Sequence, residues 1–218
     1  LAASLLAYLT STLAWKLCMG SESKKISFTQ LFIFRHVGEI LSLFNPTSIV
    51  AGESLKAFIL NKKGISPQYG ISSILLHRVL VIFGGLFLAM IAFLYLTVGH
   101  IINGQNILFI LLVVVMVIAI AYLVLRLLVH PRLFLGKTIE KLKNKTGWSF
   151  ITDELLTSVY EMNNISAGFF RENKGKFLFA FLLCMIHWIF GAMEFYIVLN
   201  MMGLDVSIIK AVTVEMGV

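Results

Sequence analysis

The feature that most constrains this chain is a set of long apolar runs. Four are long enough to cross the roughly 30 Å of hydrocarbon in a bilayer. The predicted spans are 1–19, 71–98, 107–129 and 177–202, with the start of another at 208–218. The short alternating segments of a transmembrane β-barrel are not found. We therefore expect an all-α fold, a polytopic helical membrane protein with one transmembrane domain over 1–218.

Composition supports this assignment. The chain is 59% hydrophobic and 13% charged, whereas soluble domains average about 45–50% apolar and about 25% charged residues. The net charge of +7 comes from basic residues between the apolar runs rather than from a basic–aromatic module, so we expect no nucleic-acid partner. Because the sequence begins and ends inside apolar runs, we expect a fragment of a longer protein, cut within helices at both ends.

The loops differ sharply in charge. Lys and Arg gather in segments 20–27, 61–70 and 130–176, whereas 99–106 and 203–209 have none. The positive-inside rule predicts that the three basic segments are cytoplasmic and the other two external. The expected location is a prokaryotic cytoplasmic membrane.

This topology constrains residues 28–60. Basic segments on the same side flank them, so the intervening chain must return to the side it left. Its two apolar pieces are 28–44 and 47–60, and the second would make about 21 Å of helix. That is too short to span, so we predict a re-entrant helical hairpin.

The hairpin carries an unusual set of polar residues. Arg35 and Glu39 are spaced to pair on one helix face, and Glu53 and Lys56 are i,i+3 neighbours. Asn45-Pro46 reads as a helix start whose free N–H groups attract anions. Gly52 permits close approach of a helix or ligand. Two interpretations stay open: the charges contact a polar ligand, or they only pair with each other.

Other polar residues lie within the spans. Arg78 follows His77 early in the second span, from which it either snorkels to the interface or reaches the hairpin. Glu194 lies mid-span, seven residues after His187 on the same helical face. We expect Glu194 to be protonated or paired with a partner outside this sequence. His187 either forms a polar line with Glu194 or is a satisfied core histidine, the interpretation we favour.

Segment 132–176 is polar and predicted to be a cytoplasmic amphipathic segment. Thr152 or Asp153 is a suitable N-cap, and apolar residues then recur at helical spacing: Leu155, Val159, Met162 and Phe169. The helix lies either on the membrane surface or against the protein itself.

The region from Arg35 to Arg78 resembles the flippase-like transmembrane domain of lysylphosphatidylglycerol synthetase/flippase, whose relatives accompany hopanoid biosynthesis and archaeal lipid-linked glycosylation. That pattern has Pro, then Gly-Glu or Gly-Asp, then a basic residue, as in Pro46, Gly52-Glu53 and Lys56. The segment SILLHR (73–78) is similar to the start of the family's next helix, and GLDVSIIKA (203–211) resembles a later loop.

This chain departs from the family pattern in three ways. Lys56 stands where Arg is usual, and His77 where an acidic residue is common. The family's second Pro-Gly-rich motif is expected soon after Val218 and is therefore absent from this sequence. The resemblance implies translocation or handling of lipids.

These observations predict a flippase-like membrane protein that binds and translocates an amphiphilic phospholipid or lipid-linked precursor. The alternative is a non-transporting scaffold or lipid-presenting partner of a lipid-synthesis enzyme. Expected partners are membrane lipids with anionic headgroups, and a homo-oligomer or a lipid-synthesis enzyme. We expect no catalytic residues, metal or cofactor. The predicted substrate-binding residues are Arg35, Glu39, Asn45, Pro46, Gly52, Glu53, Lys56 and Arg78.

Overall fold

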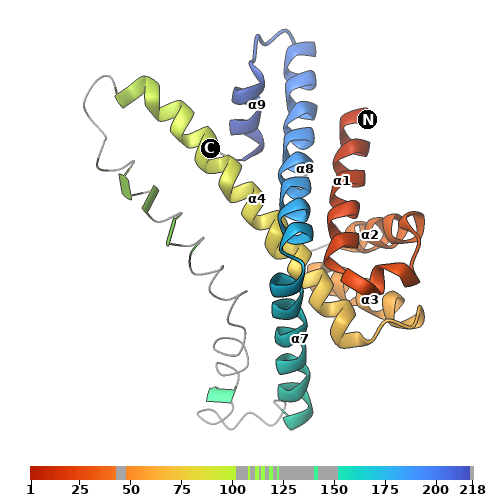
Figure 1. Cartoon of the computed structure of the whole chain (residues 1–218). Coiled ribbons are helices and arrows are strands. Elements are labelled where there is room, and N and C mark those ends of the chain that lie inside the picture. Colours follow the sequence, from red (N-terminus) through yellow and green to blue (C-terminus); the bar gives the residue numbers. More distant parts are fainter. Residues whose placement is uncertain are drawn as a thin grey trace. The chain divides into compact units, whose positions relative to one another are not determined.

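The structure, a computed structural model, describes residues 1–42, 48–101 and 152–216, with isolated positions between 108 and 141. No described residue lies in a strand, which confirms the all-α fold (Figure 1). The elements are α1 (Ala2–Cys18), a 3-10 turn η1 (Gly20–Lys25), α2 (Phe28–Ser42), α3 (Ser48–Lys62), α4 (Pro67–Ile101), α7 (Asp153–Glu172), α8 (Lys174–Met201) and α9 (Ile208–Glu215).

Two of the described helices are long and apolar enough to cross a membrane. They are Pro67–Tyr95 of α4 and Lys174–Met201 of α8. In α8 only 22% of the most apolar window is buried, whereas the core helix of a soluble protein buries most of its surface. Large apolar side chains such as Ile82, Phe179 and Val198 are exposed. An apolar exterior of this kind is what a helical membrane protein presents to lipid.

The other predicted spans coincide less fully with described helices. α1 has 17 residues, or about 26 Å at 1.5 Å per residue. α9 begins at Ile208, where the last span was predicted to start. The span predicted at 107–129 falls mostly outside the described residues, as do the loop at 99–106 and most of segment 130–151.

The chain divides into two compact units. The first comprises Leu1–Ser11, Val79–Leu123 and Phe181–Val218. In it, α4 and α8 approach closely, because a Cβ on Gly84 would lie 3.3 Å from the backbone of Cys184. Trp188 packs on Gly85 and donates from Nε1 to the carbonyl of Val81 at 2.8 Å.

The second unit comprises Thr12–Arg78 and Val124–Ala180. Its apolar cluster joins the end of α1, the residues on either side of η1, the start of α2, the end of α3 and the start of α4. The buried members are Trp15, Met19, Ile26, Leu31, Leu60, Ile65 and Ile74. These contacts hold the two ends of the hairpin together at its base.

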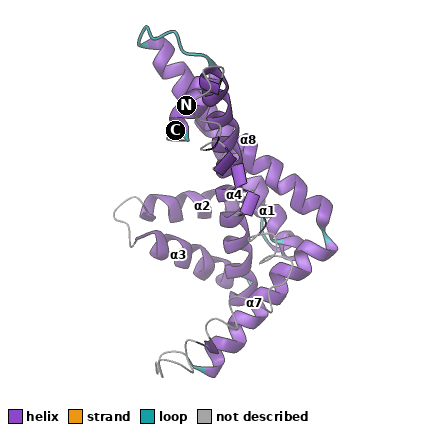
Figure 2. Ribbon diagram, turned by 90° about the vertical axis from the view of Figure 1, so that its left-hand side faces the viewer, coloured by secondary structure: helices purple, strands orange, loops and turns teal. Residues whose placement is uncertain are grey.

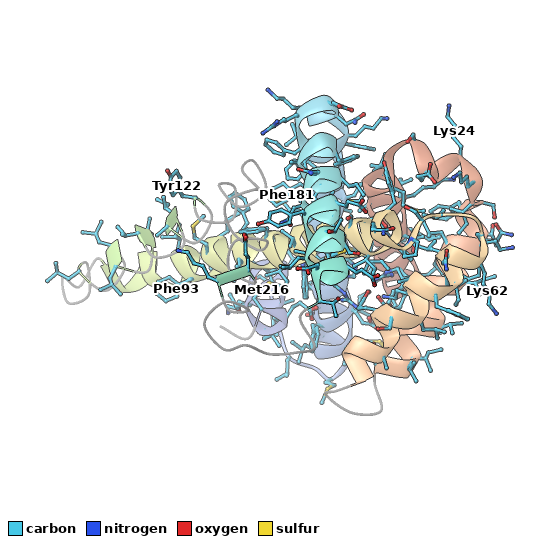
Figure 3. The ribbon with its side chains drawn as sticks, turned by 90° about the horizontal axis from the view of Figure 1, so that it is seen from below. Lys24, Lys62, Phe93, Tyr122, Phe181 and Met216 are labelled. Atoms are coloured by element: carbon cyan, nitrogen blue, oxygen red, sulfur yellow. The ribbon has the colours of Figure 1, made fainter. Side chains whose placement is uncertain are left out.

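The predicted hairpin is formed by α2 and α3, which lie side by side and antiparallel (Figure 2). Each has 15 residues, about 22 Å of helix, so neither is long enough to span a bilayer. Lys25 Nζ donates to the carbonyl of Gly64 at 3.1 Å. The segments before and after the hairpin therefore meet, as the charge pattern requires. Lys24 and Lys62 point outward from the ribbon (Figure 3).

Two glycines set how closely the hairpin helices approach. A Cβ on Gly38 would lie 2.9 Å from the carbonyl oxygen of Gly52 and 2.8 Å from Cγ of Lys56. A Cβ on Gly52 would overlap the carbonyl oxygen of Gly38 and Oγ of Ser42. Small residues at a crossing let two backbones come into direct contact, a common device in membrane helices.

The amphipathic helix α7 packs against the protein along part of its length. Asn163, Ala167 and Phe169 are buried, and Ser72 of α4 donates to the carbonyl of Met162 at 3.1 Å. Of the two predicted placements, packing on the protein is therefore present. Contact with a membrane surface stays a prediction.

The glycine crossing predicts a specific sensitivity. Gly52→Ala should lower the stability of the hairpin by about 1–3 kcal/mol, the usual cost of overpacking, because both backbones must separate. Gly168→Ala is the matched control, since a Cβ there meets nothing within 4 Å and Ala favours a helix. Thermal unfolding in detergent should show a lower midpoint for Gly52→Ala alone. An unchanged or raised midpoint would contradict the close crossing.

The meeting of the hairpin ends predicts same-sided labelling. Ser21→Cys and Asn61→Cys replace exposed residues on either side of the hairpin. Both should react with a membrane-impermeant maleimide from the same face of oriented vesicles, and the native cysteines should not react because both are buried. Reaction of the two sites from opposite faces would show that residues 28–60 cross the membrane.

Candidate functional site

The candidate site is a cluster of charged side chains in the second unit, centred on Glu53 of α3. Its Oε1 accepts from Lys56 Nζ at 3.2 Å and from Arg78 Nε at 2.6 Å. The Nη2 group of Arg78 also donates to this oxygen. One carboxylate oxygen therefore binds two cations and ties the hairpin to α4.

Arg78 is a charged residue within the candidate span of α4. It is eleven residues after Pro67, the start of that span, or about 16 Å along the helix axis. A charge inside a membrane-spanning segment is costly unless it is paired or reaches water. The ion pair with Glu53 supplies the partner.

Lys56 is enclosed on several sides. Its side chain is 5% exposed, its methylenes pack over Gly38, and its ammonium lies 5.9 Å from the ring centroid of Trp15. That is within the range of a cation–π attraction. Lys56 is therefore a buried cation neutralised by Glu53 and supported by an aromatic face.

Arg35 and Glu39 form a second ion pair on α2. Arg35 Nη2 lies 2.8 Å from Glu39 Oε1, and Arg35 is buried. The predicted i,i+4 pair is therefore present. Ser42, the last residue of α2, donates to the carbonyl of Gly38 at 2.9 Å.

The structure describes six of the eight predicted binding residues, and five of these six lie in two ion-paired groups. Glu53, Lys56 and Arg78 form one cluster, and Arg35 pairs with Glu39. Gly52 lies at the helix crossing, which assigns it a packing role. The predicted helix start at Asn45 and Pro46 lies outside the described residues. Whether these groups contact a ligand stays a prediction.

Sequence reasoning missed the support beneath the cluster. Trp15 Nε1 donates to Ser73 Oγ at 3.3 Å, and Ser73 in turn donates to the carbonyl of Gly70 at 2.8 Å. The buried ring of His77 stacks on Trp15 at 6.3 Å between centroids. Trp15 is 41 residues before Lys56 and on another helix, so no local spacing indicated the contact. The one sequence feature that pointed to this packing was Gly38, which has no Cβ and so leaves room for the Lys56 side chain.

Glu194 and His187 both face α1, within the first unit. Ser4 Oγ donates to Glu194 Oε1 at 2.9 Å, and His187 Nδ1 lies 2.9 Å from the carbonyl of Ala7. Glu194 therefore has a neutral hydroxyl of this chain as a partner, whereas a partner outside the sequence was expected. His187 has the satisfied environment expected of a core histidine.

The charge balance of the cluster favours an anion. Its two cations, Lys56 and Arg78, share one carboxylate, Glu53, which leaves one positive charge in excess among these three residues. The side chain of Arg78 is 36% exposed, so part of it remains accessible. In the described ranges no three His, Cys, Asp or Glu side chains are placed to hold a metal ion.

The shared carboxylate predicts a non-additive response to mutation. Glu53→Gln leaves Lys56 buried without its counter-charge and should lower stability by about 3 kcal/mol, near the bottom of the range for breaking a buried pair. Glu53→Gln with Lys56→Met removes both charges and should recover most of the loss. Additive losses in a thermal double-mutant cycle would contradict this coupling.

Comparison with known proteins identifies the family. The family model for the lysylphosphatidylglycerol synthase TM region matches residues 1–218. No curated protein matched the chain, and no solved structure matched it. The match covers the whole chain, including the charged hairpin, α4 and α8. This all-α membrane protein belongs to the family of the lysylphosphatidylglycerol synthase TM region.

Proposed function

We propose that this protein binds an amphiphilic phospholipid at the hairpin cluster and moves its headgroup between the two leaflets. The observation that carries the proposal is the shared carboxylate of Glu53, with Lys56 buried and Arg78 accessible on a membrane-spanning helix. Ionisable residues within membrane-spanning segments mark substrate pathways in many transporters.

The geometry suits an amphiphile. The headgroup would enter the polar cluster between the hairpin and α4, while its tails stay in hydrocarbon beside the apolar exterior of the helices. Arg78 offers a planar donor edge that matches a phosphate. The basic segments at 20–27 and 61–70 would concentrate anionic lipid at the cytoplasmic face of a prokaryotic membrane.

A second candidate is a lipid-presenting scaffold for a synthetic enzyme. It is favoured by the family description, which names the membrane region of a synthase. In that function the same cluster would hold a headgroup for a soluble domain or partner, without carrying it across. The two functions share the binding step and differ in whether lipid changes leaflet.

Translocation is tested with the full-length protein in liposomes. A fluorescent phosphatidylglycerol would be added to both leaflets, and a membrane-impermeant reductant would quench the outer one. If the protein moves lipid between leaflets, the reductant should quench more than the fraction of lipid in the outer leaflet. Arg78→Gln should slow this additional quenching at least tenfold because the headgroup loses its donor.

The control is Lys62→Met, which removes an exposed cation on the same hairpin that lies over the ring of Phe58. It should exchange lipid at the rate of the unmodified protein. Quenching that stops at the outer-leaflet fraction, with folded protein and several lipid classes, would exclude translocation. Retained binding in the same preparation would then favour the scaffold.

A further inference from the structure

We infer that Arg78 binds the phosphate group of a lipid by exchanging its ion pair with Glu53, and that Lys56 makes this exchange possible without touching the lipid. The inference rests on the proposed function for the hairpin as a headgroup site. It divides the basic residues of the cluster into one ligand and one buried counter-charge.

The two cations differ in how far their side chains are exposed to solvent. Arg78 is 36% exposed, whereas Lys56 is 5% exposed and its ammonium is covered by Glu53 and the Trp15 ring. Of the two side chains, that of Arg78 is therefore the one that a headgroup can approach. To reach Lys56 it would have to separate α2 from α3, which are in backbone contact at Gly38 and Gly52.

The donor geometry of Arg78 supports the same division. Its Nε and Nη2 groups both point at a single oxygen of Glu53. These two parallel N–H groups form the edge that binds two oxygens of a phosphate or carboxylate. A phosphodiester therefore competes for the same edge that Glu53 now occupies.

Exchange has an electrostatic requirement. When Arg78 turns to phosphate, Glu53 must not be left as an uncompensated charge in a partly buried site. Lys56 meets this requirement because it remains at 3.2 Å from Oε1. The excess positive charge of the cluster is then neutralised by the incoming anion rather than by movement of protein charges.

These separate roles predict that Lys56 and Glu53 have opposite effects on phosphate affinity. Without Lys56, Glu53 depends on Arg78 alone and holds it more tightly, so Lys56→Met should weaken phosphate binding about tenfold. Glu53→Gln added to Lys56→Met removes the competitor and should restore affinity to within about threefold of the unmodified protein. A purely structural lysine would show no such rescue.

The test uses the full-length protein in detergent, titrated with short-chain phosphatidylglycerol, short-chain phosphatidylcholine or inorganic phosphate. Binding is read by thermophoresis, and each variant is first checked by thermal unfolding. Arg78→Gln should lose at least tenfold in affinity for phosphatidylglycerol, and Arg78→Lys should recover only part because it lacks the fork. Lys62→Met should bind normally.

Each outcome decides a separate point. Normal affinity in folded Arg78→Gln would overturn Arg78 as the ligand, and normal affinity in Lys56→Met, or no rescue by Glu53→Gln, would overturn the exchange. Inorganic phosphate binding as tightly as phosphatidylglycerol would overturn a lipid headgroup as the source. The expected variant pattern without leaflet exchange in liposomes would support this inference while contradicting translocation.

Discussion

The charged site of the second unit depends on one carboxylate oxygen. Glu53 Oε1 binds Lys56 within α3 and Arg78 on α4, so a single atom adds an ionic link to the apolar contacts that join the hairpin to α4. In a low-dielectric setting such a contact is strong, and its loss is costly on both sides. The same contact leaves a cation in excess, so it supplies a polar site as well as a structural joint.

Close packing of the hairpin helices positions the charged residues. Gly38 and Gly52 bring α2 and α3 into backbone contact, and the methylenes of Lys56 are buried against Gly38. Below it, Trp15 supplies an apolar face, a hydrogen bond to Ser73 and a ring for His77. Packing and charge therefore cannot be separated here, because the glycine crossing decides which cation is buried and which remains accessible.

The sequence predicted much of this, for physical reasons that act locally. Apolar length identified α4 and α8, and the charge pattern around 28–60 required a returning hairpin. The i,i+4 and i,i+3 spacings placed Arg35 beside Glu39 and Lys56 beside Glu53. Contacts between distant segments were harder: Arg78 on Glu53 was one of two alternatives, and Trp15 beneath Lys56 was not foreseen. Helical periodicity gives the face of a helix but not the partner opposite it.

The central claim is that Arg78 exchanges a protein carboxylate for a lipid phosphate while Lys56 stays with Glu53. The most direct measurement is an electron cryomicroscopy structure of the full-length protein in nanodiscs containing phosphatidylglycerol. We expect headgroup density within hydrogen-bond distance of the Arg78 guanidinium, with the Lys56–Glu53 pair intact. Phosphate density bound to Lys56, or Arg78 still on Glu53 with the lipid bound elsewhere, would contradict it.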